Sequence, residues 1–237
     1  MSLLFTNHLE LRHLGWSGLG LRIGGAWLTI DPPAPTAEPT VVTWTEQERV
    51  AGAREGRGPL LADARVLVWL GRSGTTLHEG QPVEVEGFRV EARPYVPIPY
   101  ATPREALRKT LSACRSPRQA FRRVRFTLGR PSVPPLALRV EREGVRVVLL
   151  GQALHRFLPA AELDGLVEWA GAHELLVAGT DFDDEAATCR QLGRFDAQKR
   201  VVADTVGQVR RLLHLPPPDL AAAIAAAPPG THRLDPR

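Results

Sequence analysis

The chain has 237 residues, of which 43% are hydrophobic and 24% are charged, and its formal net charge is +4. The hydrophobic fraction excludes intrinsic disorder as the main state, and no run approaches the roughly 18 apolar residues of a membrane span, so we expect neither a span nor a signal peptide. Two cysteines, Cys114 and Cys189, are too few for a disulfide framework, which is typical of a reducing, cytoplasmic setting.

Short strands separated by turns are expected over the first hundred residues. Gly24-Gly25 between two alternating apolar runs is a two-residue hairpin signal. The apolar run Val66–Leu70 is expected to be a buried strand, and Glu46–Arg54 is expected to be a helix. The other expected strands are Leu9–Leu14, Leu19–Ile23, Ala26–Ile30, Val41–Thr43, Val83–Val85 and Phe88–Ala92.

Positive charge is concentrated in the segment that follows. Residues 102–130 carry nine basic side chains and one acidic side chain, a local charge of +8, which leaves −4 for the rest of the chain. Two helical stretches, Pro103–Cys114 and Pro117–Arg123, are expected within this segment. Six of its arginines form the basic patch that we single out as a candidate binding surface: Arg108, Arg115, Arg118, Arg122, Arg123 and Arg125.

The second half is expected to repeat a strand-rich run followed by alternating helices and strands. A hairpin is expected to turn at Arg142-Glu143-Gly144, and the last ten residues are expected to be a loose tail. The expected strands are Leu136–Glu141, Val145–Leu150, Leu175–Ala178 and Arg200–Ala203. The expected helices are Ala160–Ala172, Asp183–Leu192 with Asp181 or Asp183 as its cap, Val206–Leu213, and a short alanine-rich helix from Asp219 to Ala227.

Two such halves indicate an α+β or α/β protein built as a four-layer αββα sandwich, although periodicity alone does not distinguish it from a singly wound parallel sheet. Three motifs favour the sandwich: Gly15-Trp16-Ser17-Gly18, Asp31-Pro32, and the run V-V-T-W-T-E-Q-E-R-V-A-G at residues 41–52. Together they resemble the opening of the metallo-β-lactamase superfamily, closest to its ascorbate-phosphate-lactonase-like branch of small hydrolases. The later run Val148-Leu149-Leu150-Gly151 resembles the strand before the G-D-T turn of that family.

The resemblance implies a division of the chain. Residues 1–214 would form one metallo-β-lactamase-like domain, with the basic helical segment at about 102–130 as an insertion. Residues 215–237 would form a Pro/Ala-rich C-terminal extension.

The family's metal ligands are absent at the positions that the resemblance assigns to them. Trp44, Glu46 and Arg49 stand for its first three histidines, Glu48 for the motif aspartate, and Gln152 for the bridging aspartate of the G-D-T turn. A further histidine falls near Tyr95 or Val96, and the last one near Ala203 or Asp204. An indole N–H cannot ligate a metal, and a guanidinium would repel a dication. We therefore expect no zinc and no other cofactor.

Other catalytic patterns are weaker. Glu46 and Glu48, or Asp181, Asp183 and Asp184, could be paired carboxylates, but helix capping and solvated helix faces explain them more simply. No G-x-S-x-G elbow, P-loop or dinucleotide-binding fingerprint is present. Among the histidines, His155 has the best claim to a site because it lies four residues past Gly151.

These features predict a metal-free pseudoenzyme of the metallo-β-lactamase fold that acts as a binding or scaffolding protein. Its candidate ligand-binding groove comprises Trp44, Glu46, Glu48, Arg49, Gln152, His155 and Asp204. The basic patch would contact an acidic protein partner or a phosphate-bearing ligand. One alternative is a hydrolase of phosphoesters, lactones or amides with a displaced or metal-independent site. A second alternative is nucleic-acid binding through the basic patch.

Overall fold

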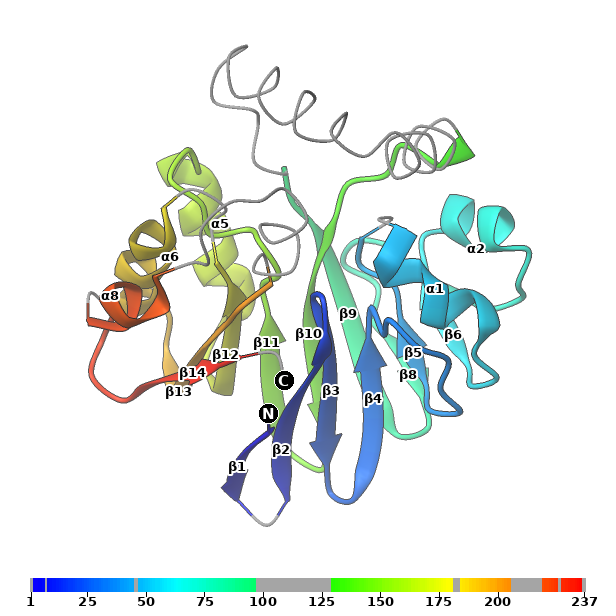
Figure 1. The fold of residues 1–237 in the computed structure, drawn as a ribbon, viewed down its shortest axis with the longest axis horizontal. Coiled ribbons are helices and arrows are strands. Elements are labelled where there is room, and N and C mark those ends of the chain that lie inside the picture. The colour runs from blue at the N-terminus through cyan, green and yellow to red at the C-terminus, as the bar shows by residue number, and fades with distance from the viewer. Residues whose placement is uncertain are drawn as a thin grey trace.

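Two sheets packed face to face form the centre of the molecule (Figure 1). The computed structural model describes residues 2–6, 8–44, 47–96, 129–180, 184–205, 219–225 and 227–235. Within these residues each sheet has seven strands. The first sheet is built entirely from the first third of the chain, and the second sheet from the remainder.

The first sheet follows chain order from β1 to β7. Its first four strands are antiparallel, and the three short strands after them add in parallel. The turn between β3 and β4 is the predicted hairpin, because Gly24 and Gly25 both adopt positive φ (58° and 89°). The bounds are β1 Ser2–Thr6, β2 Leu9–Gly15, β3 Gly18–Ile23, β4 Ala26–Ile30, β5 Thr40–Val41, β6 Leu60–Ala62 and β7 Thr75–Thr76.

The second sheet has the order β14-β13-β12-β11-β10-β9-β8. Strands β8 to β11 are antiparallel, and β11 to β14 are parallel. The hairpin predicted at Arg142-Glu143-Gly144 is confirmed, with Arg142 as the last residue of β10 and with Glu143 and Gly144 at positive φ in the turn before β11. The bounds are β8 Val83–Val85, β9 Phe88–Pro94, β10 Leu136–Arg142, β11 Val145–Leu149, β12 His173–Gly179, β13 Ala197–Ala203 and β14 Thr231–Leu234.

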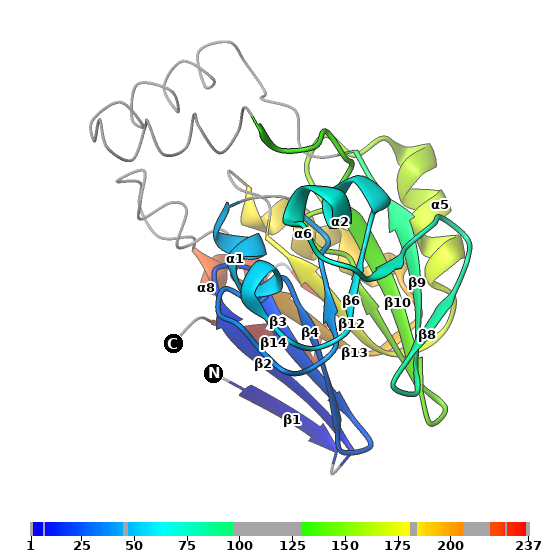
Figure 2. The ribbon, with the colours of Figure 1, turned by 90° about the vertical axis from the view of Figure 1, so that its right-hand side faces the viewer.

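Helices cover the outer faces of both sheets (Figure 2). Helices α1 (Gln47–Glu55) and α2 (Ala64–Leu70) lie on the first sheet. Helices α5 (Ala160–Ala170), α6 (Glu185–Gln191) and α8 (Leu220–Ala225) lie on the second, together with the 3₁₀ turn η1 (Leu192–Arg194). The layers therefore run helix, sheet, sheet, helix, and the predicted four-layer αββα sandwich is confirmed.

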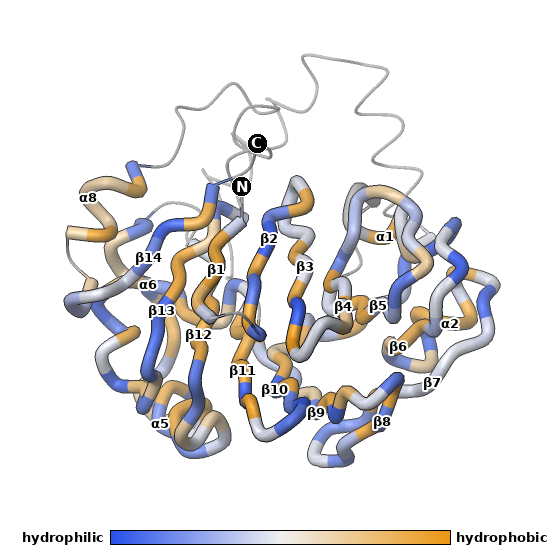
Figure 3. The backbone as a smooth tube through the Cα atoms, turned by 90° about the horizontal axis from the view of Figure 1, so that it is seen from below, coloured by the Kyte–Doolittle hydropathy of each residue, from blue (hydrophilic) through white to orange (hydrophobic). Residues whose placement is uncertain are grey.

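Three apolar clusters hold these layers together. The largest lies between the sheets and includes Leu11, Leu21 and Leu138, all fully buried. A second cluster joins the second sheet to its helices, and a third joins α1 and α2 to β6. Seen from below, the layers stand edge on, and hydrophobic segments follow strands of both sheets (Figure 3). Strand residues alternate between the faces, so one strand contributes to two clusters.

Three sequence predictions are wrong. The run Val66–Leu70 is not a strand but most of helix α2, which Asp63 caps by accepting the N–H of Arg65 and Gly71 ends in the left-handed conformation. The loose tail contains strand β14, which pairs in parallel with β13. The cap of α6 is Asp184, whose carboxylate accepts the N–H of Ala187, whereas the predicted caps Asp181 and Asp183 lie outside the described residues.

Several predictions fall outside the described residues. They are the helices at Pro103–Cys114, Pro117–Arg123 and Val206–Leu213, and all six arginines of the basic patch. Among the helices that the structure does describe, none is long and apolar enough to cross a membrane.

Candidate functional site

Of the positions that the resemblance assigns to metal ligands, Tyr95 and Gln152 line one cavity at an end of the sandwich, and Trp44 lies against Tyr95. Strands β9, β11, β12 and β13 of the second sheet end there, opposite the turn after β2 and the loops after β4 and β5. They enclose a small cavity of about 30 Å³. Its polar lining consists of Ser17, Asp31, Thr43, Tyr95, Gln152 and Thr205, and its apolar lining includes Leu19, Ile30, Leu138, Leu149 and Val177.

The first sheet supplies a fixed carboxylate to this cavity. Asp31 is buried and adopts a positive φ of 46°, which turns the chain sharply at the end of β4. Its Oδ1 accepts the backbone N–H of Thr43 at 2.8 Å, and its Oδ2 accepts the Thr43 hydroxyl. The Asp31-Pro32 motif therefore positions the beginning of the run at residues 41–52.

Side chains from the second sheet, and Trp44 from the loop after β5, lie beside it. The Tyr95 hydroxyl accepts the backbone N–H of Gln152 at 3.0 Å, and Gln152 Nε2 donates to Thr205 Oγ1 at 3.2 Å. The ring of Trp44 lies against the ring of Tyr95, with 6.4 Å between centroids. The remaining volume is close to that of a single water in the liquid, whereas ligand cavities typically span about 300–1,000 Å³.

The described residues do not fit a dinuclear zinc centre. Trp44 offers only a donor where the family has its first histidine, and the Gln152 side chain donates to Thr205 where the family has a bridging carboxylate. Across the described part of the chain, no three His, Cys, Asp or Glu side chains gather in a way that could hold a metal ion. Glu46 lies outside the described residues, as do the side chains of Glu48 and Arg49 in α1.

Three described residues of the predicted groove, Trp44, His155 and Asp204, do not line the cavity. His155 is buried beside α6, where its Nδ1 accepts the N–H of Phe157 and its carbonyl accepts Gln191 Nε2. The carbonyl of Asp204 accepts Nε2 of His13 at 2.9 Å, which links β13 to β2 across the sandwich. The residue that follows, Thr205, lines the cavity in its place.

Sequence reasoning missed part of the site. Ser17 and Thr205 line the cavity, although neither was singled out as a binding residue. Ser17 had a usable signal, because it sits within the glycine-flanked turn of the first motif. For Thr205 the only signal was its place directly after a strand, which many threonines share.

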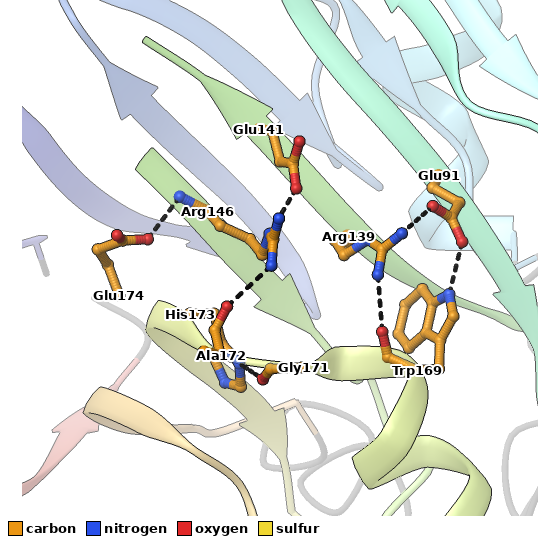
Figure 4. Close-up of polar contacts among 9 residues, drawn as sticks. All are labelled: Glu91, Arg139, Glu141, Arg146, Trp169, Gly171, Ala172, His173 and Glu174. Atoms are coloured by element: carbon orange, nitrogen blue, oxygen red, sulfur yellow. Dashed lines mark hydrogen bonds and ion pairs between the residues drawn. The ribbon is translucent and has the colours of Figure 1, made fainter. Parts of the chain in front are cut away.

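A larger cleft of about 750 Å³ lies at the opposite end of the second sheet, and its lining is mainly charged. The strand registers place Glu84 beside Arg89, Arg89 beside Glu141, and Glu141 beside Arg146. Figure 4 shows the Glu141–Arg146 ion pair and the backbone N–H of Arg146, which donates to Glu174 at 2.6 Å. Acidic and basic side chains thus alternate from strand to strand across β8 to β12. Such cross-strand pairs of opposite charge stabilise a sheet, which accounts for the charged lining of this cleft.

Two buried histidines give the fold a predicted dependence on pH. Burial lowers the pKa of His13 below its ordinary value of 6.5, and burial does the same for His173. In the neutral ring of His13, Nδ1 accepts the N–H of Gly15 at 3.0 Å and Nε2 donates to the carbonyl of Asp204, a bond that opposes but does not outweigh the effect of burial on the pKa. The Nδ1 of His173 donates to the carbonyl of Gly171 at 2.7 Å in the neutral ring.

The sign of the effect follows from proton uptake. In the unfolded chain both rings bind a proton as the pH falls through about 6.5, whereas in the folded chain they do so only at lower pH. The free energy of unfolding should therefore be fully retained above pH 6.5 and should fall as the pH drops below it, by at most about 1.4 kcal/mol per pH unit for each ring. Urea unfolding at a series of pH values below 6.5 measures this dependence. The free energy of unfolding should fall less steeply with decreasing pH in a His13→Gln/His173→Gln double variant than in the wild type. An unchanged dependence on pH would contradict the assignment.

Cys189 should be unreactive in the folded protein. It is fully buried in α6, and burial raises the pKa of its thiol to about 11, so little thiolate forms at neutral pH. In a Cys114→Ser variant, a thiol reagent such as a disulfide dye should label Cys189 only after denaturant is added. Rapid labelling of the native variant would show that α6 opens readily.

Comparisons with known proteins identify the fold. No protein-family model and no curated protein matches the sequence. Among solved structures, the metallo hydrolase Igni18 of Ignicoccus hospitalis is similar at 13% identity with a TM-score of 0.53, covering 95% of this chain and 94% of that one. The metallo-β-lactamase fold protein YhfI of Bacillus subtilis is similar at 11% identity with a TM-score of 0.53, and the match covers 92% of this chain and 88% of that one. Zn²⁺-bound PqqB of Methylobacterium extorquens is similar at 12% identity with a TM-score of 0.52, and the match covers 96% of this chain and 84% of that one.

Identities this low show the fold alone. The chain has the metallo-β-lactamase fold over nearly its whole length, as the sequence resemblance predicted.

Proposed function

We propose that this chain is a metal-free protein of the metallo-β-lactamase fold that acts by binding and not by hydrolysis. The observation that carries this proposal is the cavity of about 30 Å³ where the family places its metal centre. Among the described residues, Tyr95 and Gln152 line this cavity and Trp44 packs against Tyr95, and the volume that the described lining leaves is too small for two metal ions or a substrate. Fold alone does not decide activity, and here the site argues against the hydrolysis that the fold suggests.

The chemistry of the lining supports the same proposal. Hydrolysis in this fold needs a metal to lower the pKa of a bound water to about 7. The described lining supplies one carboxylate, Asp31, which already accepts two hydrogen bonds from Thr43. It contains no imidazole and no thiol among the described residues.

Binding is assigned to the basic patch of six arginines between Arg108 and Arg125. The segment 102–130, which contains this patch, has a net charge of +8, whereas the rest of the chain has −4, so an acidic partner would be attracted to this segment. An acidic protein surface or a phosphate-bearing ligand has the complementary charge, and guanidinium groups pair with carboxylate and phosphate in the same bidentate way. We place this role in the cytoplasm.

Metal content is the decisive measurement for the proposal. Protein purified without chelator should contain less than about a tenth of an equivalent of zinc, iron or manganese by elemental analysis. It should also show no hydrolysis of model phosphodiesters or lactones above a buffer blank. About two equivalents of tightly bound metal would overturn the metal-free assignment and restore the hydrolase alternative.

The binding role is tested with the full chain and a triple variant, Arg122→Ala/Arg123→Ala/Arg125→Ala. An acidic peptide, inorganic phosphate and single-stranded RNA serve as probes, each titrated at low and at physiological salt. Loss of peptide or phosphate binding in the triple variant is the expected result. A strong, salt-dependent affinity for RNA that the triple variant loses would instead favour the nucleic-acid alternative.

A further inference from the structure

The cavity at the strand ends contains a polar group that the described protein atoms leave unsatisfied. Ser17 is 6% exposed, its Oγ is buried, and that atom has no hydrogen-bond partner among the described residues. Buried hydroxyl groups in native proteins are almost always hydrogen-bonded, to protein or to ordered water. Ser17 lines the cavity, so the missing partner belongs in that space.

A second hydroxyl faces the same space from the other sheet. Thr205 Oγ1 accepts Gln152 Nε2 at 3.2 Å, and this leaves its own proton available for donation. Thr205 also lines the cavity, as does Asp31, whose carboxylate is an acceptor. Ser17 and Asp31 come from the first sheet and Thr205 from the second, so the polar groups face one another across the sandwich.

The size of the cavity selects the ligand. A space that holds a water needs roughly 10–15 Å³ and two to four polar partners, and a water occupies about 30 Å³ in the liquid. The cavity of about 30 Å³ meets the first condition, and Ser17, Asp31 and Thr205 supply the second. Any organic substrate is far larger than this volume.

We infer that this cavity binds one ordered water molecule, which joins Ser17 Oγ of the first sheet to Thr205 Oγ1 of the second. The water takes the place where the family holds its metal, and it connects the ends of the two sheets by hydrogen bonds. This inference rests on the proposed metal-free function, because a metal centre would fill the same space.

A single substitution, Ser17→Ala, distinguishes a hydrated cavity from a dry one by the sign of its effect. If the water is present, removing the hydroxyl deletes a water-mediated hydrogen bond, and the equilibrium constant for unfolding should rise about fivefold. If the cavity is dry, the same change removes an unsatisfied buried hydroxyl, and the constant should stay the same or fall. The second result would overturn the inference. Ser73→Ala, at an exposed serine, is the matched control and should change the constant by less than about twofold.

A direct observation complements the stability measurement. Nuclear Overhauser transfer from water to the amide proton of Gly18 should be present in the wild type and lost in Ser17→Ala. A crystal structure should place the oxygen of the bound water near Ser17 and Thr205. If wild-type protein is free of metal and shows no transfer, the inference of a bound water is wrong and the proposed function still stands. Bound metal in the same preparation contradicts the proposed function instead, so the two failures are distinguishable.

Discussion

Replacing Glu91 by alanine should lower the free energy of unfolding by about 3 kcal/mol, because the substitution leaves a charged group and an indole N–H without their acceptor. Glu91 lies on β9 and is 9% exposed. It pairs with Arg139 of β10 and accepts the indole N–H of Trp169 on α5 at 2.8 Å, while Arg139 also donates to the Trp169 carbonyl (Figure 4). The cost falls at the lower end of the range for buried pairs because the Arg139 side chain stays 26% exposed and can be partly hydrated.

Urea unfolding monitored by circular dichroism measures this effect. Glu91→Gln keeps an acceptor for the indole N–H and should lose less than Glu91→Ala does. Glu168→Ala, on the exposed side of α5, is the control and should stay within about 0.5 kcal/mol of the wild type. A Glu91→Ala variant as stable as this control would show that the network does not hold α5 on the sheet.

Alanine at Gly52 should destabilise the protein by about 2 kcal/mol, although alanine is the better helix former. A Cβ at this position in α1 would lie 2.2 Å from the carbonyl oxygen of Pro32 and 2.3 Å from that of Ala34. Both are backbone atoms that cannot rotate away, so the helix must shift at a cost of about 3 kcal/mol. The higher helix propensity of alanine returns about 1 kcal/mol.

The control for this prediction is a glycine, Gly193, that is exposed and has room beside it. A Cβ at Gly193 would meet only Pro228 Cγ at 3.4 Å, which is an ordinary contact, and Gly193 has no positive φ. Gly193→Ala should therefore change the free energy of unfolding by less than about 0.5 kcal/mol. Stabilisation by Gly52→Ala would mean that α1 does not pack closely on the 32–34 loop.

The sequence predicted the elements whose local signals and tertiary roles agree. The two hairpins were found because glycines at positive φ separate alternating strands. Helix α2 was missed because five apolar residues, V-L-V-W-L, carry no periodicity that separates a buried strand from a short helix. The deciding signals were its flanks, Asp63 as the cap and Gly71 as the end. Strand β14 was missed because its T-H-R-L sequence is polar, and only Leu234 enters the core.

The sequence predicted where the site lies in the fold but not the size of its cavity or all of the residues that line it. The register of the motifs placed Trp44, Tyr95 and Gln152 at one end of the sandwich, and the structure brings Trp44 and Tyr95 into contact. The small volume of the cavity could not be predicted, because it depends on how those large side chains pack against residues from both sheets. The same holds for the position of His155, which is close to Gly151 in sequence but packs beside α6.

Strand β14 also affects how the chain folds. It lies at the edge of the second sheet where the first sheet begins, and the ring of Phe5 on β1 meets the ring of His232 on β14 with 5.5 Å between centroids. This contact joins two strands that are separated by most of the sequence, so this edge of the sandwich closes only when both strands are in place. Contacts between the two ends of a chain require the largest loop closure and slow folding. Pairing of β14 beside β1 should therefore be a late step in folding, and the edge of the sandwich at Phe5 stays open until it occurs.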